Sequence, residues 1–460
     1  MRCSERNYFL GLGIAVMLFS TFCLPSVFAQ TCTVSASTAS IDTTFDSTFT
    51  QNGPGTGLEP SNIPGWTGAD STYSIPLPDG DTAFFFSDSY IGQSPTVAND
   101  GTVTTNANGL RTRTSNTLYA HNTIVIRNAG TGQLTTLAGP VNGSGYSTSY
   151  FSPSDSSHFF WMGDSFLINT DGQGSWKLFT FLLEWDSSLN FYGSSLAQLS
   201  VPSLSIDSIQ ALSNDPYGSP ATDPVHWGAA TTQDGAYGSY TLYIYGIEDY
   251  HPASPYQWAI SRFPHIARFD SSESISLSNL TNMNNWETYN LSSGWVADLT
   301  ETSRIVGDAN DPNNANDSIG EEYSLKKITS NAGTSYLLVT EDTNPSAYIT
   351  TDQPPGQPEE FVSDADHIIL YSACNPQGPF SAKQVVYTTP ETWATTVPGM
   401  TSGESLSGHI WMYNPHAHPQ FDSDNELLVS YDINSDAGAD LIYADAYRPK
   451  FIRIPIAGLQ

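Results

Sequence analysis

The chain has 460 residues, of which 46 are Asp or Glu and 15 are Lys or Arg, giving a formal net charge of -31 at pH 7. Binding to nucleic acid or to an anionic membrane depends on basic patches, so this composition argues against both partners. A neutral or cationic partner is more compatible with the charge.

The N-terminus has the composition of a secretory signal peptide covering residues 1–29. Basic residues precede an apolar stretch from Tyr8 to Phe22, and Val27-Phe28-Ala29 is an acceptable cleavage site. No later apolar run approaches the roughly 20 residues that span a bilayer. We therefore expect a secreted, extracellular protein without a membrane anchor.

Cleavage at this site would leave Cys32 and Cys374 as the only cysteines. Cysteines in exported proteins meet oxidising compartments, where they can form disulfides. The sequence allows a Cys32–Cys374 disulfide or two buried free thiols, and does not choose between them.

Five short runs rich in aromatic and β-branched residues recur along the chain, separated by roughly 60 to 100 residues. A polar residue and a turn precede each run, and Asp-Gly within such a turn is typical of a β-hairpin. The runs are Ala83–Phe86, Leu178–Leu183, Leu242–Tyr245, Tyr336–Val339 and Leu427–Ser430. The preceding polar residues are, in the same order, Asp70, Asp164, His226, Ser324 and His418.

Repeated hairpins without a comparably strong amphipathic helix predict an all-β protein, specifically a five-bladed β-propeller over residues 65–460. Runs that are apolar on both faces suit the middle strands of blades, because each blade lies between two others. The polar residues would then lie on the innermost strands. Residues 30–64 are expected to form an N-terminal extension with a closing strand. A tandem array of two-sheet sandwiches is the competing architecture.

The first hairpin carries the main functional candidates, Asp70 and Asp88. Their midpoint is residue 79, in the turn Pro78-Asp79-Gly80-Asp81, so antiparallel pairing would place them opposite each other, with backbones roughly 4.5 to 5.5 Å apart. A retaining glycosidase needs its two carboxyl groups about 5 to 5.5 Å apart. Two close carboxyl groups titrate apart, which gives one acid and one base. The alternative is that both residues simply end strands and cap turns.

Further polar and aromatic residues are candidates for binding a substrate, although solvated strand ends and core packing are the ordinary alternatives. They are Asp164, His226, Trp227, Glu248, Glu322, His416 and His418. Tryptophan rings can also stack on sugars, which adds Trp161, Trp258 and Trp411. His416 and His418 share a face of a strand but lack a third ligand, so no metal site is predicted. No cofactor is expected, and a structural calcium ion stays an open alternative.

The sequence lacks the motifs of several other enzyme classes. The sequence contains no G-x-S-x-G elbow, no H-E-x-x-H, no phosphate-binding loop and no dinucleotide fingerprint. Serine hydrolases, zinc proteases and nucleotide-binding enzymes of these types are therefore disfavoured.

A series of short motifs resembles, in order, the endo-D-arabinanases of glycoside hydrolase family 183 and their relatives classed as a domain of unknown function. The motifs run from about residue 65 to about residue 455. They include Gly68-Ala69-Asp70, Phe84–Asp88, Phe160–Asp164, His226–Ala230, Gly378-Pro379-Phe380 and Tyr447-Arg448-Pro449.

The resemblance implies a five-bladed propeller that cleaves chains of α-linked D-arabinofuranose. The family's catalytic aspartates lie in G-T-D-L-G and F-G-D-T motifs, which correspond to Asp70 and Asp88 here. Ala69, Ser71-Thr72 and Ser87 depart from these motifs, which leaves the substrate open. We expect a monomeric glycoside hydrolase acting on a polysaccharide or oligosaccharide. A non-catalytic glycan-binding propeller and a surface interaction module are the alternatives.

Overall fold

The computed structural model describes residues 32, 34–49, 65–91, 103–105, 111–113, 117–140, 148–216, 225–250, 261–271, 275–306, 318–330, 333–343, 366–391, 410–423, 425–435 and 443–457. All of them fall in the unit Cys32–Gln460. The predicted signal peptide, residues 1–29, and Trp258 lie outside the described residues. Within these ranges, no helix combines the length and apolar character needed to cross a membrane.

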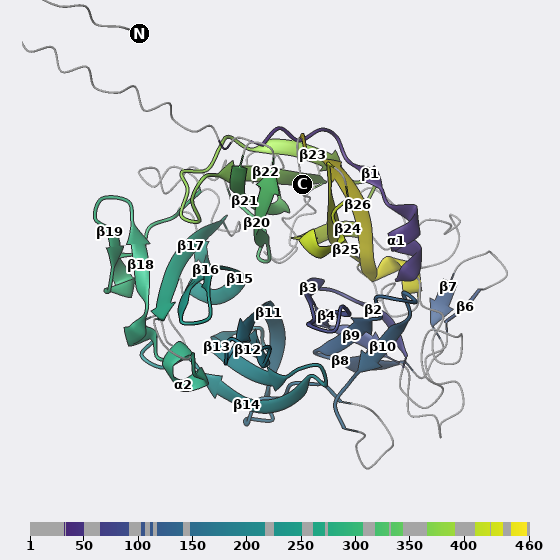
Figure 1. Cartoon of the computed structure of the whole chain (residues 1–460). Helices are drawn as coiled ribbons and strands as arrows, with labels where there is room; N and C mark the ends of the chain where they lie inside the picture. The colour runs from purple at the N-terminus through teal and green to yellow at the C-terminus, as the bar shows by residue number, and fades with distance from the viewer. Residues whose placement is uncertain are drawn as a thin grey trace, which may run out of the picture. The chain divides into compact units, whose positions relative to one another are not determined.

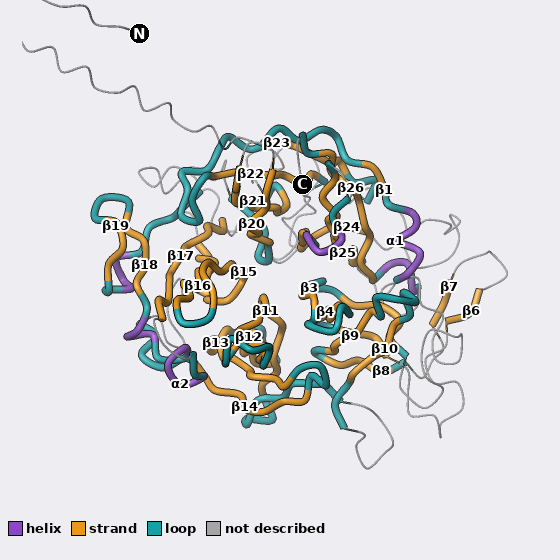
Figure 2. The backbone as a smooth tube through the Cα atoms, viewed as in Figure 1, coloured by secondary structure: helices purple, strands orange, loops and turns teal. Residues whose placement is uncertain are grey.

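The described residues form an almost entirely β structure with a few short helices (Figure 2). Five antiparallel sheets of four or five strands account for most of this part of the chain. Sheet I contains β3 (Tyr73–Pro76), β4 (Thr82–Phe86), β9 (Thr123–Arg127) and β10 (Leu134–Leu137). Sheet II contains β11 (His158–Asn169), β12 (Trp176–Asp186), β13 (Phe191–Ser200) and β14 (Ser205–Ala211).

The remaining main sheets follow in chain order. Sheet III contains β15 (Val225–Ala236), β16 (Ser239–Tyr250), β17 (Ser261–Ser271), β18 (Glu287–Asn290) and β19 (Gly294–Val296). Sheet IV contains β20 (Ser324–Ser330), β21 (Gly333–Glu341), β22 (His367–Ala373) and β23 (Gln384–Thr388). Sheet V contains β24 (Ile410–Ala417), β25 (Glu426–Ser435), β26 (Arg448–Pro455) and, from the N-terminal segment, β1 (Ser40–Ile41).

Smaller elements connect and extend these sheets. The extra strands are β2 (Trp66–Ala69), β5 (Ser89–Ile91), β8 (Leu118–Ala120), β6 (Val103–Thr105) and β7 (Arg111–Arg113). The described helices are α1 (Thr43–Thr48), α2 (Leu277–Leu280) and the 3-10 turns η1 (Met283–Asn285), η2 (Leu299–Glu301), η5 (Pro419–Phe421) and η6 (Ala444–Ala446).

The five predicted apolar runs lie in β4, β12, β16, β21 and β25, and each of these strands has a partner strand on both sides. β4 shows the reason, because all five of its residues are buried. Its two faces pack against different core clusters, Phe85 in one and Phe84 and Phe86 in another. A strand covered on both faces needs a continuous apolar sequence, and the sequence supplies one.

One edge strand of each of the five sheets contributes to contacts around two buried side chains, Asp164 and Tyr73. These strands are β3, β11, β15, β20 and β24. Asp164 on β11 accepts hydrogen bonds from the backbone N–H of Thr231 on β15 and from Lys326 on β20, both at 2.7 Å. The Tyr73 hydroxyl on β3 donates to the carbonyl oxygen of Ala229 on β15 at 3.1 Å, and its ring lies 4.1 Å from that of His416 on β24. In Figure 1 these strands lie toward the middle of the view, with the other strands of each sheet farther out.

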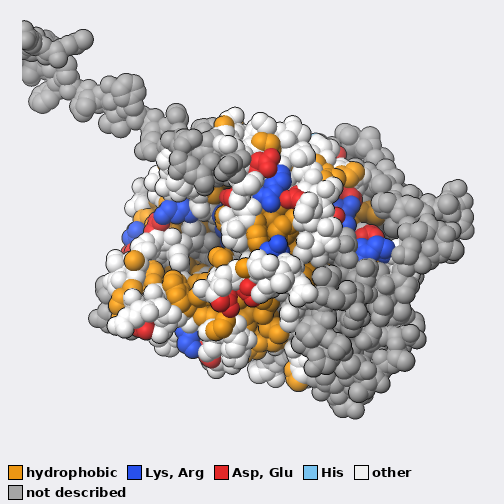
Figure 3. All heavy atoms as spheres, turned by 45° about the vertical axis from the view of Figure 1, so that its right-hand side comes forward, with side chains coloured by type: hydrophobic (Ala, Val, Ile, Leu, Met, Phe, Trp, Pro, Cys, Tyr) orange, Lys and Arg blue, Asp and Glu red, His pale blue; other side chains and the backbone are white. Residues whose placement is uncertain are grey.

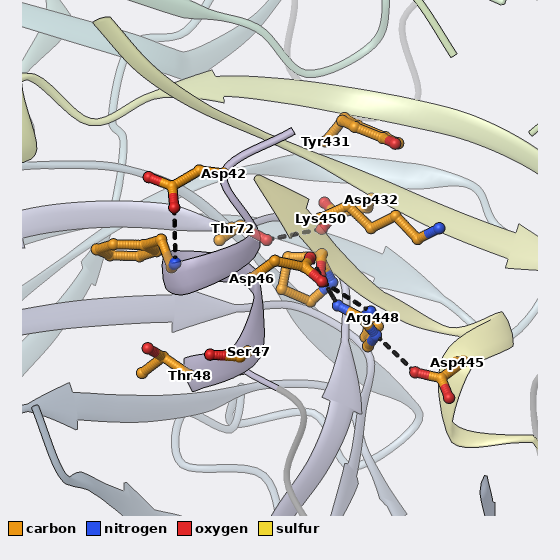
Figure 4. Close-up of polar contacts among 12 residues, drawn as sticks. Asp42, Asp46, Ser47, Thr48, Thr72, Tyr431, Asp432, Asp445, Arg448 and Lys450 are labelled. Carbon is orange, nitrogen blue, oxygen red and sulfur yellow. Dashed lines mark hydrogen bonds and ion pairs between the residues drawn. The ribbon is translucent and has the colours of Figure 1, made fainter. Parts of the chain in front are cut away.

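The N-terminal segment joins sheets that are far apart in sequence. β1 pairs with β26 (Ser40 opposite Arg453), and a disulfide links Cys32 to Cys374, just after β22. Asp42 caps α1 by accepting a hydrogen bond from the Phe45 N–H at 2.8 Å, as Figure 4 shows. This segment therefore fastens sheet IV to sheet V.

Helix α1 is itself held to sheet V. Arg448, at the start of β26, binds Asp46 of α1 and Asp445 of η6, each at 2.9 Å (Figure 4). On the described part of the face in Figure 3, Lys and Arg side chains likewise lie beside Asp and Glu. Charges of both signs are thus mixed there despite the acidic composition.

Candidate active site

The first hairpin brings Asp70 and Asp88 opposite each other. β3 pairs with β4 in the register Tyr73 opposite Phe85, and the same register continues to residues 70 and 88. The Asp70 N–H donates to the Asp88 carbonyl oxygen at 3.2 Å, and the Ser87 N–H donates to the Asp70 carbonyl oxygen at 3.1 Å. The predicted backbone pairing is therefore observed.

The two carboxyl oxygens of Asp70 have different surroundings. Its Oδ2 accepts a hydrogen bond from the Tyr413 hydroxyl at 2.8 Å, whereas its buried Oδ1 has no partner. Burial and the nearby Asp88 raise the pKa of Asp70 to about 8, against the opposing effect of the hydrogen bond from Tyr413. At neutral pH these surroundings favour the protonated form of Asp70, and Oδ1 is the oxygen without a hydrogen-bond partner.

Asp88 is fixed by aromatic neighbours. Its Oδ1 accepts a hydrogen bond from Trp161 Nε1 at 2.9 Å and lies 3.1 Å from His121 Nδ1. The His121 ring stacks on Phe159 at 3.9 Å, and the Tyr447 hydroxyl donates to the Asp88 carbonyl oxygen at 3.2 Å. The Asp88 side chain keeps 16% of its surface exposed, so solvent or a ligand can reach it.

Two more acidic side chains hold the residues that follow Asp70. Glu322, which precedes β20, accepts a hydrogen bond from the Ser71 hydroxyl at 2.5 Å. Asp432, on β25, accepts one from the Thr72 hydroxyl at 2.6 Å, drawn in Figure 4. Both acids are buried. The sequence pattern predicts Glu322 as a substrate ligand, whereas no local pattern marks Asp432, Tyr413 or Tyr447 as site residues.

Three other predicted substrate ligands lie on sheets II and III and are buried. Asp164 is buried and paired with Lys326. Trp227 is fully buried and packs edge-on against Trp286, so the structure places this ring in the core instead of at a sugar-binding surface. His226 is also buried, and burial lowers its pKa to about 4.

Glu248 serves an ion-pair network in sheet III. It accepts hydrogen bonds from Arg304, at 2.8 Å to each carboxylate oxygen, and its Oε2 also lies 2.8 Å from His265 Nε2. Burial opposes its ionisation, but Arg304 and His265 lower the pKa of Glu248 to about 2. These partners use both of its oxygens, which explains the residue without a substrate.

The two predicted histidines of sheet V are buried between sheets. His418 Nδ1 lies 2.6 Å from the Ser74 hydroxyl on sheet I, and Nε2 lies 2.9 Å from the Ser430 hydroxyl on β25. His416 Nε2 lies 3.3 Å from Glu322 Oε2. Burial lowers the pKa of His418 to about 3 and that of His416 well below its usual range. His418 thus joins sheets I and V, while His416 contacts Glu322.

Within the described ranges, no three His, Cys, Asp or Glu side chains are grouped so that they could hold a metal ion. The groups that the structure places at Asp70 and Asp88 are carboxyl groups and hydroxyl, imidazole and indole donors. Such a set can transfer protons and can hold a substrate rich in hydroxyl groups.

Residues 61–456 match the model of a protein family described as a domain of unknown function, DUF5005. No curated protein sequence matches the chain.

Among solved structures, a proposed hydrolase from Bacteroides ovatus is similar over 90% of this chain and 90% of its own, with a TM-score of 0.56 and 16% sequence identity. This likeness indicates a shared fold. An exo-beta-1,3-galactanase from Phanerochaete chrysosporium covers 84% of this chain and 60% of its own, at a TM-score of 0.38 and 9% identity. A mutant alpha-L-arabinofuranosidase from Fusarium graminearum is similar over 84% of this chain and 84% of its own, with a TM-score of 0.37 and 9% sequence identity. The latter two scores are too low to support any conclusion about this chain.

The family model spans all five sheets and includes both Asp70 and Asp88. The chain belongs to this family, the domain of unknown function DUF5005.

Proposed function

We propose that this protein is a secreted glycoside hydrolase and that Asp70 and Asp88 are its catalytic carboxyl groups. The observation that carries the proposal is that the two paired aspartates have different surroundings. Asp70 has a pKa raised to about 8 and a free Oδ1, while Asp88 receives a hydrogen bond from Trp161 and is partly exposed. Hydrolysis of a glycosidic bond needs such an acid beside a carboxylate.

In the proposed reaction Asp70 Oδ1 donates its proton to the glycosidic oxygen while the bond from that oxygen to the anomeric carbon breaks. In one route Asp88 attacks the anomeric carbon as a nucleophile, and water then displaces it from that carbon while Asp70 takes a proton from the water. In the other route Asp88 removes a proton from the water that attacks the anomeric carbon directly. One water is consumed in either case, and its hydroxyl ends on the anomeric carbon. The configuration of the released sugar distinguishes the two routes.

A five-bladed propeller is part of the proposal. Its support is the contact pattern of the first strands around Tyr73 and Asp164, together with the link between sheets I and V through Ser74 and His418. Tandem sandwiches give no reason for such contacts among strands of different sheets. Export is supported by the Cys32–Cys374 disulfide, because such bonds persist in oxidising compartments.

For the substrate we propose a furanose polysaccharide of the arabinan type. The support is the resemblance of the motifs around Asp70 and Asp88 to those of endo-D-arabinanases. The net charge of -31 favours a neutral glycan over a polyanionic one. We also propose that the enzyme works as a monomer and without a cofactor.

The test is a screen of furanose and pyranose polysaccharides for released oligosaccharides, using the wild type and the variants Asp70→Asn, Asp88→Asn and Asp79→Asn. Asp79 is exposed in the turn of the same hairpin and serves as the matched control. We expect the first two variants to lose at least about 100-fold in kcat, the usual contribution of a positioned acid or base. They should still bind the polysaccharide in affinity electrophoresis, and the control should resemble the wild type.

A wild type that binds glycans but releases no product under any condition would refute hydrolysis and support a glycan-binding propeller. Full activity in Asp70→Asn and Asp88→Asn would also contradict the proposal, because it would place the chemistry elsewhere.

A further inference from the structure

The residues after Asp70 adopt a conformation that needs outside support. Ser71 has a φ of +56°, in the left-handed region that residues other than glycine rarely adopt. Ser71 and Thr72 are nevertheless both fully enclosed. Because Asp70 is joined directly to Ser71, whatever holds Ser71 also fixes the direction of the Asp70 side chain.

Glu322 supplies support from sheet IV. It binds the Ser71 hydroxyl through Oε1 at 2.5 Å, and its Oε2 lies 3.3 Å from His416 Nε2 on sheet V. His416 is placed in turn by the Tyr73 ring, 4.1 Å away. Ser71 is therefore tied to two other sheets through one carboxyl group.

Asp432 supplies support from sheet V. Its Oδ1 accepts from the Thr72 hydroxyl at 2.6 Å, and the backbone N–H groups of Ser71 and Thr72 also donate to this carboxyl group. Its Oδ2 is buried without a partner. Both residues that follow Asp70 are thus bound by Asp432.

These two acids are better suited to positioning than to chemistry. Burial and the nearby Asp70 raise the pKa of Glu322 and of Asp432 well above the usual range, which favours the neutral form of both acids. In the neutral form each acid still holds its hydroxyl partner, Ser71 or Thr72, and places no negative charge next to Asp70. Other titratable groups also face Asp70, Glu322 and Asp432 and influence their ionisation. They are Asp88, Glu321, His416, Tyr413 and Tyr447.

We infer that Glu322 and Asp432 are positioning residues, which hold Ser71 and Thr72 so that the Asp70 carboxyl group stays buried opposite Asp88. The inference rests on the proposed function for its effect on catalysis. Its effect on the Asp70 carboxyl group can be measured without any substrate.

The experiment follows the Asp70 carboxyl carbon by NMR between pH 4 and pH 10 in protein labelled with 13C-aspartate, with Asp70→Asn identifying the resonance. The variants are Glu322→Ala, Asp432→Ala and the amides Glu322→Gln and Asp432→Asn. Glu391→Ala is the matched control, because Glu391 is a buried acid bound to Tyr431, the neighbour of Asp432 in sequence. Should the alanine variants fail to fold, Ser71→Ala and Thr72→Val remove the same two hydrogen bonds from the other side.

The wild type and Glu391→Ala should titrate near pH 8 at Asp70. In the alanine variants, or in Ser71→Ala and Thr72→Val, the released segment gives Asp70 access to water, so its midpoint should fall by at least one pH unit. The amide variants should restore the midpoint to within about half a unit of the wild type, because an amide oxygen still accepts the hydrogen bonds. With a substrate in hand, kcat should fall at least tenfold in the alanine variants with KM little changed.

An unchanged Asp70 midpoint in the alanine and hydroxyl variants would overturn the inference. Amide variants that behave like the alanine variants would also overturn it, because they would show that the acids act through charge. If no polysaccharide is cleaved while the titration behaves as expected, the proposed function fails and the positioning role stands.

Discussion

Replacing Asp70 by Asn should stabilise the protein at neutral and alkaline pH. The pKa of Asp70 is raised from 3.8 to about 8 by burial and by Asp88. The folded protein therefore favours the neutral acid, and its contribution to stability is fully present below pH 3.8. That contribution is lost as the pH rises toward 8, because the unfolded chain ionises freely and the folded chain does not.

The magnitude follows from the size of the shift. One pKa unit corresponds to about 1.4 kcal/mol, so a rise from 3.8 to about 8 corresponds to an unfavourable free energy of about 6 kcal/mol once the pH exceeds 8. The residue as a whole keeps some surface exposed although its Oδ1 is buried, so water screens part of this cost. We therefore expect Asp70→Asn to increase the free energy of unfolding by about 2 to 4 kcal/mol at pH 8 and by far less at pH 4.

Urea unfolding at pH 4, 6 and 8 measures this difference, provided that the m-value is the same in both proteins. Asp79→Asn makes the same change of charge in the exposed turn of the same hairpin, and its effect should stay within about 0.5 kcal/mol at every pH. If Asp70→Asn gains no more stability at pH 8 than at pH 4, the ionised Asp70 is not destabilised by its surroundings, and the assignment of Asp70 as the proton donor loses its basis.

Four further substitutions test other parts of the structure by urea or thermal unfolding. Arg448→Met should cost about 3 to 5 kcal/mol, because it strands two acidic partners of a buried arginine; Arg268→Met, in a more exposed pair, should cost about 1 or less. Gly228→Ala should cost at least about 2 kcal/mol, because φ is +107° and a Cβ would lie 2.4 Å from Phe181. Glu248→Gln should destabilise the protein above pH 4.5, where the paired carboxylate contributes, and the loss should vanish as the pH falls to about 2. An equal cost for the two arginine variants, a neutral Gly228→Ala or a pH-independent Glu248→Gln would each contradict the corresponding contacts.

The hairpin pairings and the central strand of each sheet could be predicted from the sequence, because they depend on local pairing. A turn at Asp79 fixes which residues face each other across it, so the opposition of Asp70 and Asp88 followed from counting alone. The apolar runs identified the central strands for the same reason, since a strand covered on both faces must be apolar throughout.

The contacts between sheets were not accessible in this way. Glu322 lies 251 residues from Ser71, and Asp432 lies 360 residues from Thr72. Nothing in a local pattern reports such distances. Trp227 shows the converse case. The sequence offers it as a ring for sugar stacking, but it is fully buried against Trp286, which lies on the connection between β17 and β18.

Several long-range contacts have the same physical effect, which is to hold Asp70 and the two residues that follow it in place. Two acidic side chains opposite each other weaken a hairpin, and a left-handed Ser71 adds to the cost. A local sequence with this cost would relax by turning Asp70 toward water. Glu322, Asp432 and Tyr413 come from sheets IV and V and oppose that relaxation. The stability of the surrounding sheets is thus used to maintain one unfavourable carboxyl group, which is the pattern expected of a site kept for its chemistry.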